Sequence, residues 1–172
     1  GIAIMLKLSK LEPDWIEPNL ILVETSIQEG NLSSARARLD KLLAKGLRDQ
    51  RVHFLNGRIK EESGLLEDAK AIFNDLAIAQ EPYPSAAGQL AKVLMVQERW
   101  DEAENWIRRG LLLRPTGLDL IANLAVVLLR QNKLDDALLI SNSLIETIPK
   151  NTDILINHAS ILQELSLIHI SE

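Results

Sequence analysis

The chain has 172 residues and a net charge of −5, with 47% hydrophobic residues, 25% charged residues and no cysteine. This composition is typical of a folded protein, and it excludes disulfides, thiol catalysis and cysteine-ligated metals. Aromatic residues make up only 3% and the net charge is negative, which argues against a nucleic-acid-binding surface. No apolar run reaches the roughly 18 residues that a membrane span needs.

A period of 34 residues runs through the sequence. One column of that period consists of alanine, a second of small residues, and a third of prolines separated by one or three periods. In order, these columns are Ala35, Ala69, Ala103 and Ala137; Gly57, Ala91, Ala125 and Ala159; and Pro13, Pro115 and Pro149. Three columns in one register are typical of stacked helical hairpins.

Taken in chain order, the columns predict a partial repeat at 1–15 whose helix covers 1–11. Four whole repeats follow at 16–49, 50–83, 84–117 and 118–151, and 152–164 supply the first helix of one more. Each whole repeat should contain two amphipathic helices, called here its first and second helix. Gly30 and Gly64 suit the turn between them, because a left-handed backbone is easiest for glycine. Pro115 and Pro149 should close the second helices.

The small residues of the columns predict close helix crossings. A larger side chain at such a point would push the two backbones apart. We therefore expect six of these alanines to be buried. They are Ala35, Ala69, Ala91, Ala103, Ala125 and Ala137.

These residues together resemble the tetratricopeptide repeat. The third repeat shows the pattern in Ala87, Leu90, Ala91, Leu94, Trp100, Ala103, Ile107, Gly110 and Pro115. The resemblance implies an all-α fold, a right-handed α-α superhelical solenoid of tetratricopeptide-type hairpins whose first helices line a concave surface. The sequence departs from the pattern at Lys60, Ser141 and His158, where an apolar residue, an aromatic and a leucine are expected. For His158 we expect a partly buried, hydrogen-bonded imidazole.

The last eight residues, 165–172, lose the register of the repeats. Their sequence, LSLIHISE, resembles a translated sequencing adapter, the transposase end sequence used in library preparation. We therefore expect them to be a non-native tail that follows an interior fragment of a longer protein.

The candidates for catalysis favour a structural interpretation. Acidic pairs such as Asp101 and Glu102 stand just before each later column alanine, where carboxylates complement a helix N-terminus. The three histidines do not converge as metal ligands must. No nucleotide-binding or nucleophile motif occurs. The sequence thus predicts a chain that is not an enzyme and holds no cofactor or metal.

The concave surface is the remaining candidate site. Its expected residues are Glu17, Leu20, Ile21, Glu24, Arg51, Phe54, Leu55, Arg58, Gln89, Lys92, Asn123, Val126, Arg130, Asn157 and Ser160. From these we select Phe54, Arg58, Gln89, Lys92, Asn123 and Asn157 as a peptide-binding groove, with a positive stretch at Arg51, Arg58 and Lys92. Asn123 and Asn157 resemble the asparagine ladder in the repeats of O-linked N-acetylglucosamine transferases and many bacterial relatives. An equally good interpretation is that these amides bond locally to their own backbone or to solvent.

The function that the sequence predicts is a protein-interaction scaffold, which binds an extended peptide or a partner helix in the groove. Its partners would be proteins or peptides, not nucleic acid. One alternative is the substrate-recruiting arm of a larger glycosyltransferase, sulfotransferase or methyltransferase. Another is a structural role in cell-envelope assembly.

Overall fold

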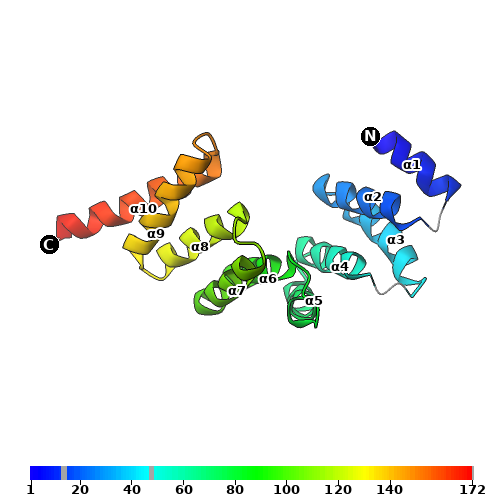
Figure 1. Cartoon of the computed structure of the whole chain (residues 1–172), viewed down its shortest axis with the longest axis horizontal. Helices are drawn as coiled ribbons and strands as arrows, with labels where there is room; N and C mark the ends of the chain where they lie inside the picture. Colours follow the sequence, from blue (N-terminus) through cyan, green and yellow to red (C-terminus); the bar gives the residue numbers. More distant parts are fainter. Residues whose placement is uncertain (13–14, 47–48, 172) are drawn as a thin grey trace. The chain divides into compact units, whose positions relative to one another are not determined.

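The computed structural model describes residues 1–12, 15–46 and 49–171, with side chains described up to Leu167. These residues form ten α-helices and no strand (Figure 1), which confirms the predicted all-α helical-repeat solenoid. Pro13, the first member of the proline column, lies outside the described residues. The chain divides into two compact units, residues 1–86 and 87–172, and each is described by itself.

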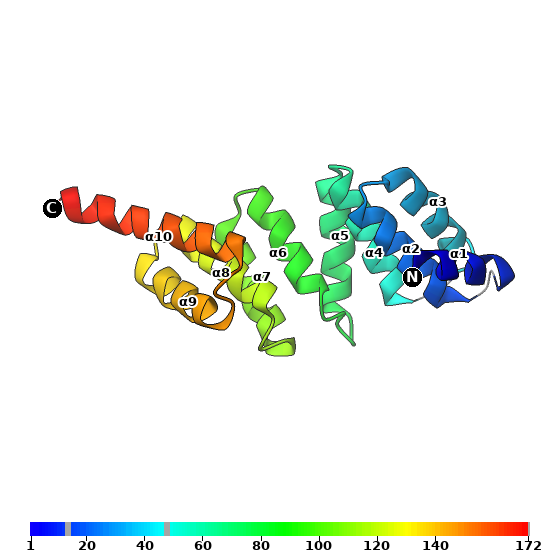
Figure 2. The ribbon, with the colours of Figure 1, turned by 90° about the horizontal axis from the view of Figure 1, so that it is seen from above.

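The N-terminal unit contains five helices, in which the second helix of each hairpin packs on its first. Their bounds are α1 Ile2–Leu11, α2 Ile16–Gln28, α3 Leu32–Leu43, α4 Gln50–Glu62 and α5 Leu66–Ile78. The pairs α2 with α3 and α4 with α5 form hairpins, while α1 contacts α2 and α3 contacts α4 (Figures 1 and 2). The core of α2, α3 and α4 is aliphatic throughout, with Val23, Ala35 and Val52 completely buried.

The C-terminal unit repeats the arrangement with α6 to α10. The bounds are α6 Ala86–Val96, α7 Trp100–Leu113, α8 Leu118–Arg130, α9 Leu134–Thr147 and α10 Thr152–Ser171. Helix α8 contacts α7, α9 and α10, so it lies at the centre of this unit. Helix α10 continues without a break through residues 165–171, which the sequence separated from the repeats.

The alanine columns occupy the helix crossings, as predicted. All six alanines expected to be buried are buried, with at most 1% of any of them exposed. Ala159, the last member of its column, is exposed. It lies on α10, and no other helix among the described residues covers it.

One position in the turn of every hairpin has a left-handed backbone. The φ angles are 71° at Gly30, 75° at Gly64, 58° at Glu98 and 60° at Asn132, at intervals of one period. The predicted role of the two glycines is therefore confirmed. The same conformation at Glu98 and Asn132 is strained, because a Cβ disfavours positive φ. Asparagine tolerates this region better than glutamate does, so most of the strain falls on Glu98.

We expect Glu98→Gly to raise the free energy of unfolding by about 0.5–1 kcal/mol, because glycine removes the steric cost of the left-handed turn. Urea denaturation followed by circular dichroism measures this change. The matched variant is Gly64→Ala, where an added Cβ would meet no atom within 4 Å. Its effect therefore comes from the backbone alone, and it should destabilise by about 1 kcal/mol. A loss of stability in Glu98→Gly would contradict this explanation.

Two of the departures from the repeat pattern explain one another. Ser141 is 1% exposed and stands where an aromatic residue was expected, and His158 stands where a leucine was expected. The Ser141 hydroxyl lies 2.9 Å from Nδ1 of His158, across the interface of α9 and α10. The expectation of a partly buried, hydrogen-bonded imidazole is thus confirmed. The third departure is Lys60, whose Nζ forms an ion pair with a carboxylate oxygen of Asp68 at 2.9 Å.

Candidate functional site

A pocket of about 490 Å³ lies on the first helices of the C-terminal unit, α8 and α10, beside the turn that joins α8 to α9. It gathers four residues that the repeat register placed on the concave surface. These are Val126 and Arg130 from α8, and Asn157 and Ser160 from α10. The remaining lining residues are Leu129, Asn132, Leu134, Gln163 and Glu164. The pocket therefore combines amide and hydroxyl groups, one cation, one carboxylate and an aliphatic surface.

The helical period explains why these side chains meet. Val126 and Arg130 are four residues apart on α8, and Asn157 and Ser160 are three apart on α10, so each pair lies on one face of its helix. The Ser160 hydroxyl donates to the carbonyl of Ile156 at 3.0 Å, within its own helix. The lone pairs of the hydroxyl oxygen remain available to a donor on a ligand.

The α8–α9 turn forms one wall of the pocket, and contacts with α7 hold this wall in place. The guanidinium of Arg130 lies 5.6 Å from the centre of the Trp100 ring, a cation–π contact. In the turn itself, the side-chain amide of Gln131 donates to Asp101 at 2.8 Å.

Glu104 of α7 fixes the end of the same turn. Its carboxylate accepts a hydrogen bond from Nζ of Lys133 at 2.8 Å and also pairs with Arg108. The hydrogen bond from Lys133 is the main cause that lowers the pKa of Glu104 to about 2. The carboxylate is therefore ionised throughout the neutral range. Because Lys133 lies between Asn132 and Leu134, this ion pair positions two residues of the pocket.

Three other selected residues of this unit lie outside the pocket. Asn123, on α8, is half-buried, and its amide nitrogen has no hydrogen-bond partner among the described residues. On α6, Gln89 is half-buried and Lys92 is exposed. The structure thus brings Asn157 into a pocket but leaves Asn123, Gln89 and Lys92 beyond its rim.

The two selected residues of the N-terminal unit lie on α4. The ring of Phe54 is half-buried in an aromatic cluster, 5.6 Å from the ring of Phe73 and 4.7 Å from that of Tyr83. Burial raises the pKa of the Tyr83 hydroxyl. Arg58 is half-buried, and its Nε has no hydrogen-bond partner among the described residues.

The prediction that Arg51 contributes a free positive charge to the concave surface is wrong. Its guanidinium pairs with Glu17 of α2 at 2.6 Å and with Asp49 at 2.6 Å. These hydrogen bonds, with the one to Asp49 the strongest, raise the pKa of Arg51, and the hydrogen bond from Arg51 lowers the pKa of Asp49. Two carboxylates therefore neutralise this cation. Leu20 and Leu55, also expected on the concave surface, are core residues that are each 6% exposed.

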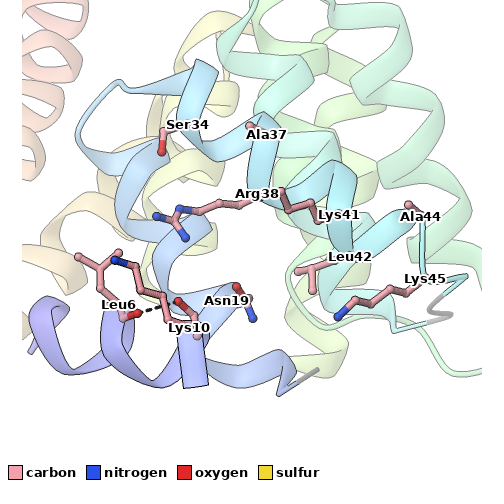
Figure 3. A pocket seen from close by; sticks show the side chains of 11 residues that line it. Leu6, Lys10, Asn19, Ser34, Ala37, Arg38, Lys41, Leu42, Ala44 and Lys45 are labelled. Carbon is pink, nitrogen blue, oxygen red and sulfur yellow. Dashed lines mark hydrogen bonds between the residues drawn. The ribbon is translucent and has the colours of Figure 1, made fainter. Parts of the chain in front are cut away.

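Two groups of lining residues were not predicted from the sequence. One comprises Asn132, Gln163 and Glu164 of the C-terminal pocket. The other is the lining of a second pocket, of about 790 Å³, between α1 and α3 (Figure 3). Its cations on α3 are Arg38 and Lys41, and Lys45 follows in the turn after the helix. The spacing of three residues places Arg38 and Lys41 on one face of the helix, a signal readable in the sequence.

Within the described part of the chain, no group of three or more histidine, cysteine, aspartate or glutamate side chains is arranged to hold a metal ion. Of the helices formed by those residues, none combines the length and the apolar character that crossing a membrane requires.

No protein-family model matches the chain, and no curated protein matches it significantly. Solved structures with similar folds do match. One is a thermophilic TPR protein of Thermus thermophilus, with a TM-score of 0.78 and 22% identity over 94% of this chain and 89% of that chain. Another is PilF of Pseudomonas aeruginosa, with a TM-score of 0.76 and 16% identity over 87% of this chain and 68% of that chain. These likenesses confirm the expected tetratricopeptide-type fold.

A third similar structure contains a bound peptide. It is the second TPR domain of human RPAP3 in complex with an HSP70 peptide, with a TM-score of 0.59 and 16% identity. The match covers 63% of this chain and 91% of that domain.

Proposed function

We propose that this chain, which has the tetratricopeptide-repeat fold, is a protein-interaction scaffold that binds an extended peptide or a partner helix along its first helices. The observation that carries the proposal is the pocket on α8 and α10, which gathers Val126, Arg130, Asn157 and Ser160. A similar fold holds a peptide in human RPAP3, and this adds support by analogy of fold. The proposal involves no catalytic step.

The chemistry of the pocket suits a peptide. The Asn157 amide has both a donor and an acceptor, so it can bond the N–H and C=O of one extended residue. Arg130 offers a planar donor pair to a carboxylate, and Val126 with Leu129 offers an aliphatic surface to an apolar side chain. We propose that Asn123, Gln89 and Lys92 extend this surface within the C-terminal unit. Phe54 and Arg58 form a corresponding contact area on α4.

The test is an immobilised peptide array probed with the wild type and with the double variant Arg130→Ala, Asn157→Ala. We expect the double variant to bind the peptides selected by the wild type at least ~10-fold more weakly, since hot-spot truncations cost ~1–2 kcal/mol or more. The matched control is Asn142→Ala, Lys150→Ala, which removes one amide and one cation from exposed positions outside the pocket.

Circular dichroism must first show that both double variants keep the wild-type helical content. Equal weakening in the two double variants, or unchanged binding in both, would remove the site from α8 and α10. A third variant, Arg58→Ala with Lys92→Ala, extends the test to the other cations. If that variant loses binding to acidic peptides alone, this result would support a role of Arg58 and Lys92 in selectivity.

A further inference from the structure

The second pocket differs from the first in its charge and in the helices that line it. It lies between α1, which precedes the first hairpin, and α3, which is a second helix, whereas the proposed peptide contacts belong to first helices. Its volume is about 790 Å³. Four of its lining residues are cations, namely Lys10 of α1, Arg38 and Lys41 of α3, and Lys45 of the turn after α3. Among the described lining residues there is no carboxylate, although the whole chain has a net charge of −5.

Helix ends explain only part of this arrangement. Lys10 and Lys41 stand in the last turns of α1 and α3, where a cation complements the helix dipole. Arg38 stands in the middle of α3, where the dipole has no such effect. Within the described residues, Lys10, Arg38 and Lys41 make no ion pair, whereas Arg51 of the same unit pairs with two carboxylates. Lys10, Arg38 and Lys41 thus place three positive charges in the pocket, and no carboxylate of the described residues pairs with them.

Cations lie on both walls of the pocket. Figure 3 shows Arg38 reaching from α3 toward Leu6 and Lys10 on α1, while Lys45, in the turn after α3, extends below Leu42. Leu6 and Leu42 supply apolar surface between these cations. An anion that entered the pocket would therefore meet cations from both helices, with an aliphatic surface beneath.

The spacing of the cations identifies the kind of ligand. The lining residues on α3 extend from Ser34 to Leu42, which is about 12 Å at 1.5 Å per residue, and Ala44 and Lys45 continue the lining in the turn after the helix. A single inorganic anion would need donors that converge on one point, whereas these cations are distributed along a helix. An extended peptide of about five residues covers the same length and carries one charge on each acidic side chain. Arg38 can pair with a carboxylate through two parallel hydrogen bonds.

We propose that the pocket between α1 and α3 binds a short, extended acidic segment of a partner protein. Carboxylates of that segment pair with Lys10, Arg38 and Lys41, and one apolar side chain packs on Leu6 and Leu42. This site is separate from the proposed contacts on the first helices, so the chain would hold two segments at once. Because the cations are at the surface, binding weakens as salt screens them.

The test measures binding of a fluorescein-labelled pentapeptide, Asp-Glu-Leu-Glu-Asp, by fluorescence anisotropy at low salt. Its control is the amide peptide Asn-Gln-Leu-Gln-Asn, which has the same shape without the charge and should not bind. We expect the variant Arg38→Ala, Lys41→Ala to bind the acidic peptide about 10-fold more weakly than the wild type. If that variant loses helical content by circular dichroism, Arg38→Gln with Lys41→Gln replaces it, since glutamine keeps part of each aliphatic stem.

The matched control variant is Lys7→Ala, Arg36→Ala. It removes two cations from α1 and α3 that do not line the pocket, so the net charge changes equally. Binding within about 2-fold of the wild type in this control supports the proposal. Equal weakening in both double variants would show an effect of net charge alone and overturn it.

Two further outcomes would also overturn the proposal. One is displacement of the peptide by inorganic tripolyphosphate at a concentration below the peptide's own Kd, which would identify a phosphate site. The other is loss of binding to the acidic peptide in the variant Arg130→Ala, Asn157→Ala, which would place that peptide on the first helices instead. Unchanged binding of the peptide by this variant supports a separate site.

Discussion

Replacing Phe73 with alanine is expected to lower the free energy of unfolding of the N-terminal unit by about 3–5 kcal/mol. Phe73 is fully buried in α5, and its ring lies 5.6 Å from that of Phe54. It also fills the space above Gly57, where an added Cβ would come within 2.6 Å of the ring. Truncation therefore removes a large apolar side chain and leaves a cavity that two rigid helices cannot close.

Urea denaturation followed by circular dichroism measures this loss, and the same helix offers a control. Ile78 of α5 is 61% exposed. Its replacement by alanine should change the stability by no more than about 0.5 kcal/mol, as is usual for exposed positions. A similar loss in Ile78→Ala and Phe73→Ala would contradict core packing as the cause, and helix propensity could not explain it, because alanine is the better helix former.

The second large effect is expected in the C-terminal unit, from Ala125→Phe. Ala125 is 1% exposed on α8, the helix that contacts α7, α9 and α10. A phenyl ring at this crossing would force the helices apart, and overpacking of this kind typically costs about 1–3 kcal/mol. We expect a value near the upper end, because the added group is large and the site is enclosed on several sides.

Its control is the same substitution one period later. Ala159 belongs to the same column but is exposed on α10, so Ala159→Phe should leave the stability within about 0.5 kcal/mol of the wild type. The pair compares one chemical change at two equivalent repeat positions, which differ in whether another helix covers them. A loss in Ala159→Phe as large as that in Ala125→Phe would argue against overpacking as the cause.

Most of the fold could be predicted from the sequence, because the period of 34 residues places small residues at the same helix crossing in each repeat. The buried alanines and the turns at Gly30 and Gly64 follow directly from the columns. The turns at Glu98 and Asn132 did not follow from the glycine signal, since glutamate is rare at positive φ and asparagine, though better tolerated there, does not require it. At those positions the packing of the two helices decides the backbone conformation and overrides the preference of the residue.

The site was harder to predict, since the register shows which face a residue is on but not which neighbours it has. The register put Asn157 and Arg130 on the same surface, and both line one pocket. It did not show that Glu17 reaches Arg51, although these residues are one period apart and so occupy equivalent positions on adjacent first helices. Opposite charges one period apart are a readable signal for such pairs. The aromatic neighbours of Phe54 depend on side-chain packing that no spacing reveals.

The contact between Ser141 and His158 distinguishes the correct pairing of two helices from incorrect pairings. Hairpins that share the same alanine columns present nearly interchangeable packing surfaces, so a helix could dock on the wrong neighbour during folding. Only the correct pairing of α9 with α10 gives the imidazole of His158 its partner in the buried hydroxyl of Ser141. A misplaced helix would lose this hydrogen bond, at a cost of about 0.5–1.5 kcal/mol, and the Ser141 hydroxyl would keep only its bond to the carbonyl of Leu138 at 3.1 Å. A single polar contact can thus encode the order in which otherwise similar repeats assemble.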